Sequence, residues 1–345
     1  MGLGDINYES SMVEETLDLI LVPEEEPLYA DISYQKGSVI IIAGPTASGK
    51  TELSLVLAKN LGGEIISADA IQVYRGMDIG SAKASIEQQQ QVPHHLLDIR
   101  DVDDPINAVD FCLEAKKACD AILSRNKVPI LVGGSGFYLK AFMYDSPEGP
   151  PSDAQIRKDL SEEVDLMGVD VAYQKLSKLD PKYASTITKN DRQKIIRGLE
   201  IIKITGGKVS DLPWKERVLS KEYDFHPWFV YRDRGVLYRR VEERCDWMLK
   251  NGFLEEVIRL DRDGIRANFS ASQAIGYRQA LDYLDGACSE KDYNTFLDKF
   301  KQASRNYVKR QFTWFKKDAD FKQVDLDIYD LEAVVDNIIV EYLSV

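Results

Sequence analysis

The residues best suited to chemistry in this sequence are the eight from Gly44 to Thr51, which read G-P-T-A-S-G-K-T. They match the pattern G-x-x-x-x-G-K-[ST], whose glycines let backbone N–H groups turn toward phosphate oxygens at the start of a helix. Lys50 adds a full positive charge, and the Thr51 hydroxyl can bind Mg²⁺. We therefore predict that a phosphate or diphosphate group is held by Gly44, Pro45, Thr46, Ala47, Ser48, Gly49, Lys50 and Thr51.

Asp69 is the acidic residue best placed to act beside this loop. It stands eighteen residues after Thr51, near the end of an expected strand at 64–67. Another expected strand, at 128–132, ends in Gly-Gly-Ser, where a P-loop ATPase normally carries an acid for Mg²⁺. The sequence also has no Asn-Lys-x-Asp motif of the kind that reads guanine. Asp69 is therefore predicted to serve as a base or as a Mg²⁺ contact.

Strands and helices alternate around these residues. The β-branched run 38–43 precedes the phosphate loop, and apolar residues recur at helical spacing after it. Another helix is expected after Asn107, a residue type that caps helix starts. Such alternation is typical of a parallel sheet with helices on its faces. We predict an α/β fold, a P-loop NTPase-like parallel sheet flanked by helices, with a helical insertion domain.

Changes in composition along the chain predict five segments. Residues 147–151 form a break rich in proline, and charged helical sequence follows it up to a Gly-Gly pair at 206–207. The predicted segments are an acidic N-terminal extension at 1–37, the first part of the α/β core at 38–144, the helical insertion at 145–205, a mainly helical second part of the core at 206–325 and a C-terminal helix at 326–345.

The charge of the chain is unevenly distributed. The formal net charge is −13, but residues 1–35 contain nine acidic and no basic residues, which leaves −4 for the other 310. The start of the sequence shows no basic targeting pattern, and no apolar run approaches the roughly 20 residues of a membrane-spanning helix. The four cysteines and three histidines show no metal-binding spacing. We expect a cytoplasmic protein that does not span a membrane.

Seven motifs between residues 38 and 316 make the sequence resemble the tRNA dimethylallyltransferase family, also called tRNA isopentenyltransferases. They are the phosphate loop, the stretch 69–83, P-H-H-L-L-D-I-R at 93–100, G-G-S-G-F-Y at 133–138, N-D-R-Q-K-I-I-R at 190–197, I-G-Y-R at 275–278 and R-Q-F-T-W at 310–314. Ser135 stands where many members have threonine, which keeps the hydroxyl. Without the C-terminal zinc module of eukaryotic cytosolic members, the sequence resembles the compact bacterial form.

The resemblance implies transfer of a dimethylallyl group from dimethylallyl diphosphate to N6 of an adenine next to the anticodon, at position 37, of certain tRNAs. On the matching positions Asp69 is the expected general base, and Lys50, Thr51 with Mg²⁺, and Arg240 are expected to stabilise the departing diphosphate. The expected tRNA contacts are Asp69, Ala70, Ile71, Gln72, Ser135, Arg157, Gln193, Lys194, Ile195, Ile196, Arg197, Gln273, Ala274, Ile275, Gly276, Tyr277 and Arg278. The insertion is expected to clasp the anticodon stem-loop, and the protein to act as a monomer.

Other functions fit parts of the same pattern. The nearest is adenylate isopentenyltransferase, which prenylates free AMP, ADP or ATP, although the insertion length and the matched tRNA-contact positions favour tRNA. A small-molecule kinase or a nucleotide-dependent switch without turnover would also need the phosphate loop. Clustered basic residues such as Lys194 and Arg197 would equally suit a solvated helix face.

Overall fold

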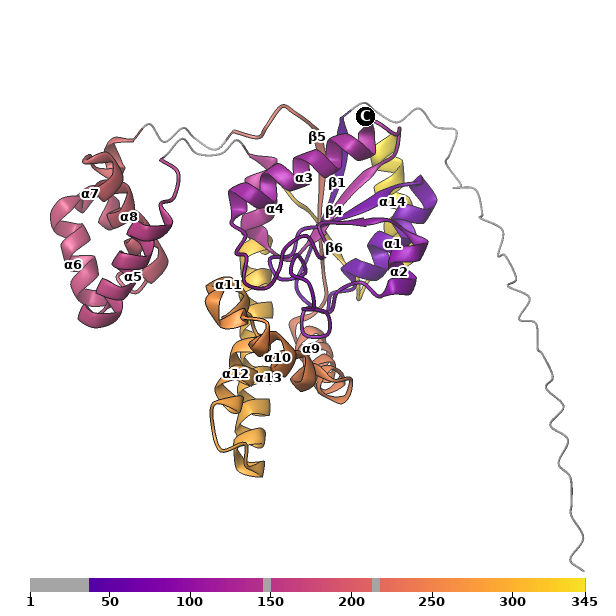
Figure 1. Ribbon diagram of the computed structural model, residues 1–345. Coiled ribbons are helices and arrows are strands. Elements are labelled where there is room, and N and C mark those ends of the chain that lie inside the picture. The colour runs from indigo at the N-terminus through magenta and orange to yellow at the C-terminus, as the bar shows by residue number, and fades with distance from the viewer. Residues whose placement is uncertain (1–36, 145–149, 213–217, 345) are drawn as a thin grey trace, which may run out of the picture.

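A six-stranded sheet, with every strand parallel to its neighbours, lies at the centre of the structure (Figure 1). The structure is a computed structural model, and it describes residues 37–144, 150–212 and 218–344. The order across the sheet is β3-β2-β4-β1-β5-β6. The strands are β1 (Ser38–Ala43), β2 (Glu64–Ser67), β3 (His94–His95), β4 (Pro129–Gly133), β5 (Asp224–Tyr231) and β6 (Lys322–Asp325). The predicted fold class, a parallel α/β sheet, is confirmed.

Helices cover both faces of the sheet, because successive side chains of a strand point to opposite faces. Ile40 and Ile42 of β1 are buried against α1 and α14, whereas Val39 and Ile41 are buried on the side of α3 and α4. The side chain of Asn107 caps α3 by accepting hydrogen bonds from two N–H groups of its first turn. The flanking helices are α1 (Lys50–Leu61), α2 (Ile86–Gln91), α3 (Ala108–Leu123), α4 (Gly136–Met143) and α14 (Leu331–Leu343).

Strand β5, which the sequence patterns do not predict, lies next to β1 in the sheet. The segment expected to be mainly helical therefore contains a strand of the central sheet. Pro227 argues against a central strand because proline has no N–H to donate to a neighbour. However, β6 pairs with β5 only from Trp228 onward, so Pro227 lies where β1 is the single neighbour of β5. A proline is tolerated at such a place.

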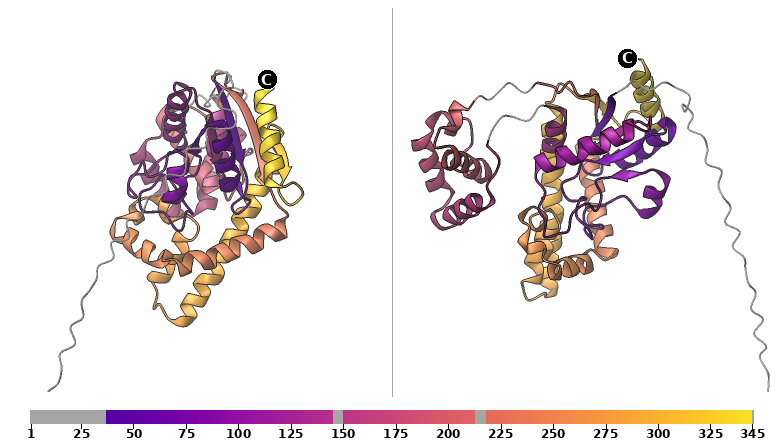
Figure 2. Two further views of the ribbon diagram at one scale, coloured as in Figure 1. Left: turned by 90° about the vertical axis from the view of Figure 1, so that its right-hand side faces the viewer. Right: turned by 45° about the horizontal axis from the view of Figure 1, so that its top comes forward.

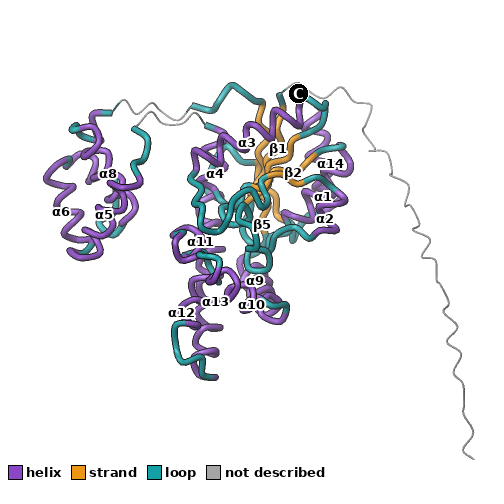
Figure 3. The backbone as a smooth tube through the Cα atoms, in the orientation of Figure 1, coloured by secondary structure: helices purple, strands orange, loops and turns teal. Residues whose placement is uncertain are grey.

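Five helices between β5 and β6 form what we call the helical lobe, which extends from the carboxyl ends of the strands (Figures 1 and 2). Figure 3 shows loops gathered between the strands and this lobe. The 27-residue α13 runs from the lobe back to the sheet, where Phe315 stacks on Phe229 with ring centroids 5.3 Å apart. The lobe contains α9 (Arg234–Lys250), α10 (Phe253–Arg262), the 3-10 turn η2 (Ile265–Ala267), α11 (Phe269–Ser272), α12 (Tyr277–Leu284) and α13 (Glu290–Lys316).

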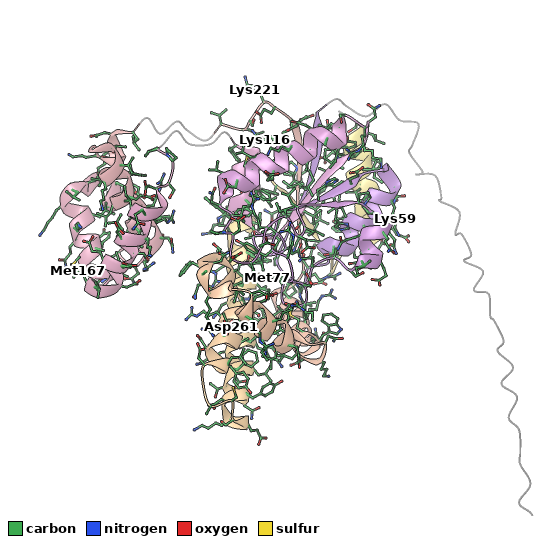
Figure 4. All side chains as sticks on the ribbon, viewed as in Figure 1. Lys59, Met77, Lys116, Met167, Lys221 and Asp261 are labelled. Atoms are coloured by element: carbon green, nitrogen blue, oxygen red, sulfur yellow. The ribbon has the colours of Figure 1, made fainter. Side chains whose placement is uncertain are left out.

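The insertion has a hydrophobic core of its own, which includes Leu160, Leu176, Ile195 and Leu199. It contains α5 (Ala154–Met167), α6 (Val169–Leu179), α7 (Pro181–Ala184) and α8 (Arg192–Thr205). The 3-10 turn η1 (Val209–Asp211), beyond the predicted end of the insertion at residue 205, packs against α7 and α8. Met167 is labelled on the insertion in Figure 4, which shows the side chains of the insertion packed together and apart from the sheet. Neither here nor elsewhere in the described ranges is a helix long and apolar enough to cross a membrane.

Candidate active site

The predicted phosphate loop connects β1 to α1 at the carboxyl end of the sheet. At Gly44 an added Cβ would lie 2.3 Å from the carbonyl oxygen of Val230, so only glycine fits. Gly49 has a φ of 109°, a left-handed conformation that favours glycine. Arg232 holds the loop from outside, because its Nε donates a hydrogen bond to the Ser48 carbonyl oxygen over 3.0 Å. Close packing and this anchor fix the shape of the loop.

Lys50, at the start of α1, carries the positive charge of the loop. Its Nζ donates a hydrogen bond to the Pro45 carbonyl oxygen over 2.7 Å. Burial and the nearby Arg244 guanidinium lower the pKa of Lys50 to about 7, although the Asp69 carboxylate acts in the opposite direction. The Asp69 carboxylate alone does not offset burial and the Arg244 charge, and a bound diphosphate would supply further negative charge beside the amine.

Asp69 lies just beyond β2 with one carboxylate oxygen fixed by the backbone. Its Oδ1 accepts hydrogen bonds from the N–H groups of Ile71, over 2.8 Å, and Gln72, over 3.3 Å. Within the described part of the chain, Oδ2 has no recorded hydrogen-bond donor. The carboxylate is therefore held in one orientation while Oδ2 can accept a proton from a bound molecule.

Two arginines of α9 approach the phosphate loop in different ways. Arg240, the predicted diphosphate partner, is exposed, and its Nε donates a hydrogen bond to the Ala47 carbonyl oxygen over 2.9 Å. It lines a cavity beside the phosphate loop, and Asp69 is not among the residues that line that cavity. Arg244, one turn further along, lines this cavity and also the one that contains Asp69. Its Nε is buried and has no hydrogen-bond partner among the described residues. A half-buried cation whose buried donor is unpaired is suited to binding an anion.

Tyr307 and Gln311 of α13 complete the polar wall of the site. The Oε1 of Gln311 accepts the N–H of Thr46 over 2.9 Å, and its Nε2 donates to the Gly134 carbonyl oxygen over 3.0 Å. Gln311 thus ties the phosphate loop to the turn that carries Ser135. Burial raises the pKa of Tyr307 to about 12, so its hydroxyl stays protonated at neutral pH.

One cavity of about 400 Å³ brings most of the predicted site together. Apolar side chains of the lobe, among them Met248 and Phe300, form part of its wall. A cavity with a cationic side and an apolar side suits a ligand that combines a diphosphate with a short hydrocarbon group. The predicted residues that line it are Thr46, Lys50, Thr51, Asp69, Ala70, Ile71, Gln72, Ser135, Gln273, Ala274, Ile275 and Tyr277.

Other predicted tRNA contacts do not line the cavity. Gly276 and Arg278 lie beside its wall, and Arg278 is exposed. Arg157, Gln193 and Lys194 belong to the insertion, where Arg157 donates a hydrogen bond to Gln193 over 3.2 Å. Gln193 and Lys194 are exposed, so both remain available to a partner molecule.

Three insertion residues that are predicted to contact tRNA are held by contacts within the insertion. Ile195 and Ile196 are 0% and 2% exposed in the core of the insertion, so their side chains pack inside it, and a tRNA contact at these two positions stays a prediction. Arg197 pairs with the buried Glu200 over 2.9 Å and donates to the Pro150 carbonyl oxygen. The apolar pair continues the helical spacing of α8, which the motif match alone does not take into account.

Comparison with known proteins places the chain in a family. The family described as IPP transferase matches residues 72–318. Over 340 residues, 99% of each chain, the sequence is 49% identical to the tRNA dimethylallyltransferase of Protochlamydia amoebophila. The chain belongs to the tRNA dimethylallyltransferase family.

Further members of the tRNA dimethylallyltransferase family agree in length and in structure. The Chlamydia pneumoniae member is 48% identical over 309 residues, which cover 89% of this chain and 90% of that protein. The solved structure of the full-length tRNA isopentenylpyrophosphate transferase of Bacillus halodurans is 39% identical, with a TM-score of 0.64 over 89% of this chain and 97% of that one. A eukaryotic dimethylallyltransferase acting on tRNA is 27% identical, with a TM-score of 0.71 over 88% of this chain and 80% of that one.

Proposed function

We propose that the protein transfers the dimethylallyl group of dimethylallyl diphosphate to N6 of the adenine at position 37 of certain tRNAs, using Asp69, Lys50 and Arg244. Membership of the tRNA dimethylallyltransferase family supports the overall reaction. One observation carries the assignment of residues. A guanidinium with an unpaired buried Nε, a lysine amine and a carboxylate line the same cavity.

Lys50 and Arg244 act on the leaving group. As the bond between C1 of the dimethylallyl group and the diphosphate oxygen breaks, its electron pair leaves with the oxygen, and negative charge grows there. Donors that are in place before the reaction stabilise such charge without having to reorganise. The Arg244 fork can donate two hydrogen bonds to phosphate oxygens, whereas Lys50 and the loop N–H groups supply charge and dipoles.

Asp69 acts on the nucleophile. The lone pair of adenine N6 is delocalised into the ring, so N6 attacks C1 more readily when a base accepts its proton. As the N6–C1 bond forms, the proton passes from N6 to Oδ2 of Asp69, while Oδ1 stays fixed by the N–H groups of Ile71 and Gln72. The products are the N6-prenylated adenine, a protonated Asp69 and diphosphate.

Thr51 is the candidate protein ligand for Mg²⁺. Its side chain is exposed at the start of α1 and lines both cavities of the phosphate loop. In the described ranges no group of three or more His, Cys, Asp or Glu side chains is arranged to hold a metal by itself. Mg²⁺ commonly binds through one or two protein groups together with phosphate oxygens and water, which fits this donor set. When bound it would neutralise charge on the diphosphate.

The tRNA must present a base that is turned out of the anticodon loop, because a stacked adenine cannot enter a cavity. Gln273 of the lobe and Gln193 and Lys194 of the insertion are exposed polar groups at predicted tRNA contacts. We propose that the lobe and the insertion hold the anticodon stem-loop while the adenine enters beside Asp69. Every proposed catalytic group comes from one chain, so the proposed reaction needs no second copy, and we propose that the protein acts as a monomer in the cytoplasm.

The test offers radiolabelled dimethylallyl diphosphate and Mg²⁺ to the protein with unmodified total tRNA in one reaction and with AMP or ATP in another. We expect label in the tRNA alone. Label in the free nucleotide alone would instead indicate an adenylate isopentenyltransferase. Label in neither, with phosphate transferred from labelled ATP, would indicate a kinase.

A further inference from the structure

Glu256 of α10 is a buried carboxylate that binds the backbone of a distant loop. Its Oε2 accepts hydrogen bonds from the N–H groups of Asp78, over 3.0 Å, and Ile79, over 2.7 Å. Its Oε1 accepts the N–H of Gly80 over 3.1 Å and the hydroxyl of Tyr277 over 2.7 Å. Glu256 is 3% exposed, and the described part of the chain shows no ion pair to it. Backbone and hydroxyl dipoles therefore balance its charge.

The loop that Glu256 binds, residues 76–83, is called the wall loop because part of it lines the active-site cavity. An added Cβ at Gly80 would lie 2.3 Å from the Phe253 ring and 2.6 Å from the Tyr277 ring, so the backbone presses against both rings. Met77, labelled in Figure 4, is buried where the loop meets the lobe. The wall loop is thus held by Glu256 and by two aromatic rings of the lobe.

The carbonyl groups of the wall loop in turn hold two side chains of the active site. The Ser81 carbonyl oxygen accepts a hydrogen bond from Nε2 of Gln72 over 3.2 Å and one from Nη2 of Arg244 over 3.4 Å. Nε2 of Gln72 also donates to the Ala82 carbonyl oxygen over 3.3 Å. Glu256 is thus connected to Arg244 through the wall loop: it binds three N–H groups of the loop, and the Ser81 carbonyl of the same loop binds Arg244.

We propose that Glu256 is a positioning residue, which fixes the wall loop so that the Ser81 carbonyl aims Arg244 at the diphosphate site. The inference rests on the proposed role of Arg244 as a diphosphate ligand. Glu256 itself does not line the cavity and does not contact the substrate. The wall loop lines the cavity and also holds Gln72, so it is the dependence on Arg244 that separates aiming of Arg244 from a general contribution of Glu256 to the cavity or to folding.

A double-mutant cycle on binding of inorganic diphosphate with Mg²⁺ tests this, with affinities measured by calorimetry on the full chain. Arg244→Gln should weaken binding by about tenfold or more, because a hydrogen bond to a charged group is lost. Glu256→Gln should weaken it by about threefold to tenfold in the wild-type background and leave it unchanged in the Arg244→Gln background. Glu255→Gln removes the same charge from an exposed neighbour and should change neither affinity.

The proposal would be overturned if Glu256→Gln weakened diphosphate binding equally in the wild-type and the Arg244→Gln backgrounds. It would also be overturned if Glu256→Gln lowered the melting temperature but bound diphosphate as tightly as the wild type. If Glu256→Gln does not fold, Tyr277→Phe removes only one of the four hydrogen bonds and should show a smaller loss with the same dependence on Arg244. The cycle reads diphosphate binding and does not need transfer to tRNA. If the cycle gives the expected affinities but the protein transfers no dimethylallyl label to tRNA, the proposed function is wrong while the positioning role of Glu256 is retained.

Discussion

Asp69 and Arg244 line the same cavity, carry opposite charges and form no ion pair with each other. Burial lowers the pKa of Arg244 and the Asp69 carboxylate raises it, so the two groups act on each other through the intervening space. Nε of Arg244 has no hydrogen-bond partner among the described residues, and the backbone hydrogen bonds to Asp69 end on Oδ1. In the proposed reaction the reacting bond lies between them, with the proton leaving toward Asp69 and the diphosphate toward Arg244.

Replacement of Arg244 should be far more harmful than replacement of Arg240. Arg244→Gln is expected to lower the rate of dimethylallyl transfer by about 10²-fold to 10³-fold, the usual effect of removing one donor from a developing anion. Arg244→Lys should recover part of this loss, because it keeps the charge without the planar fork. Arg240→Gln is the matched control on the same helix. Single-turnover rates in which Arg240→Gln is the slower variant would contradict the assignment.

Lys50 should make substrate binding depend on pH. In the free protein its pKa is about 7, and a bound diphosphate favours the charged amine and raises that pKa. Affinity for dimethylallyl diphosphate should therefore be highest below about pH 7 and fall as the pH rises above it. Calorimetry at pH 8 in buffers of different ionisation enthalpy should show uptake of about one proton. Lys50→Met should abolish this proton uptake. Equal binding heats for the wild type in the two buffers would disprove the proposed change in the pKa of Lys50.

Much of this site could be predicted from the sequence because its motifs are local. The phosphate loop needs a strand, two glycines and a helix start within a few residues, and the structure has that arrangement between β1 and α1. Strand β5 was missed because Pro227 and the polar residues around it hide the usual strand pattern. Its place in the sheet depends on pairing with β1, a segment about 180 residues earlier.

The choice between Arg240 and Arg244 could not be made from sequence either. The two lie four residues apart on α9, so spacing puts them on one side of the helix. Only the packing of α9 against α13 and the wall loop decides which guanidinium enters the cavity. The roles of Gln311, which lies in the R-Q-F-T-W motif, and of Glu256 could not be read from sequence for the same reason, because each bonds backbone groups more than 170 residues away in the chain.

Within the insertion, Lys194 and Arg197 should have different roles. Lys194 is exposed, so Lys194→Gln should lower tRNA affinity at low salt and reduce the slope of log affinity against log salt by about 1, with no change in stability.

Arg197 pairs with the buried Glu200, so Arg197→Gln should lower the free energy of unfolding by up to about 3 kcal/mol. Filter binding over a salt series and thermal unfolding measure the two effects. An unchanged salt slope for Lys194→Gln would exclude the insertion contact.

In the proposed reaction, Asp69 takes the proton from N6 of adenine while Lys50 and Arg244 hold the diphosphate. The most direct measurement is single-turnover transfer of label from dimethylallyl diphosphate to tRNA by Asp69→Asn, together with the affinity of that variant for each substrate. Asparagine has the same shape and can still accept the N–H groups of Ile71 and Gln72, so we expect a rate loss of about 10²-fold to 10⁴-fold with both affinities kept. Transfer at the wild-type rate would contradict the account.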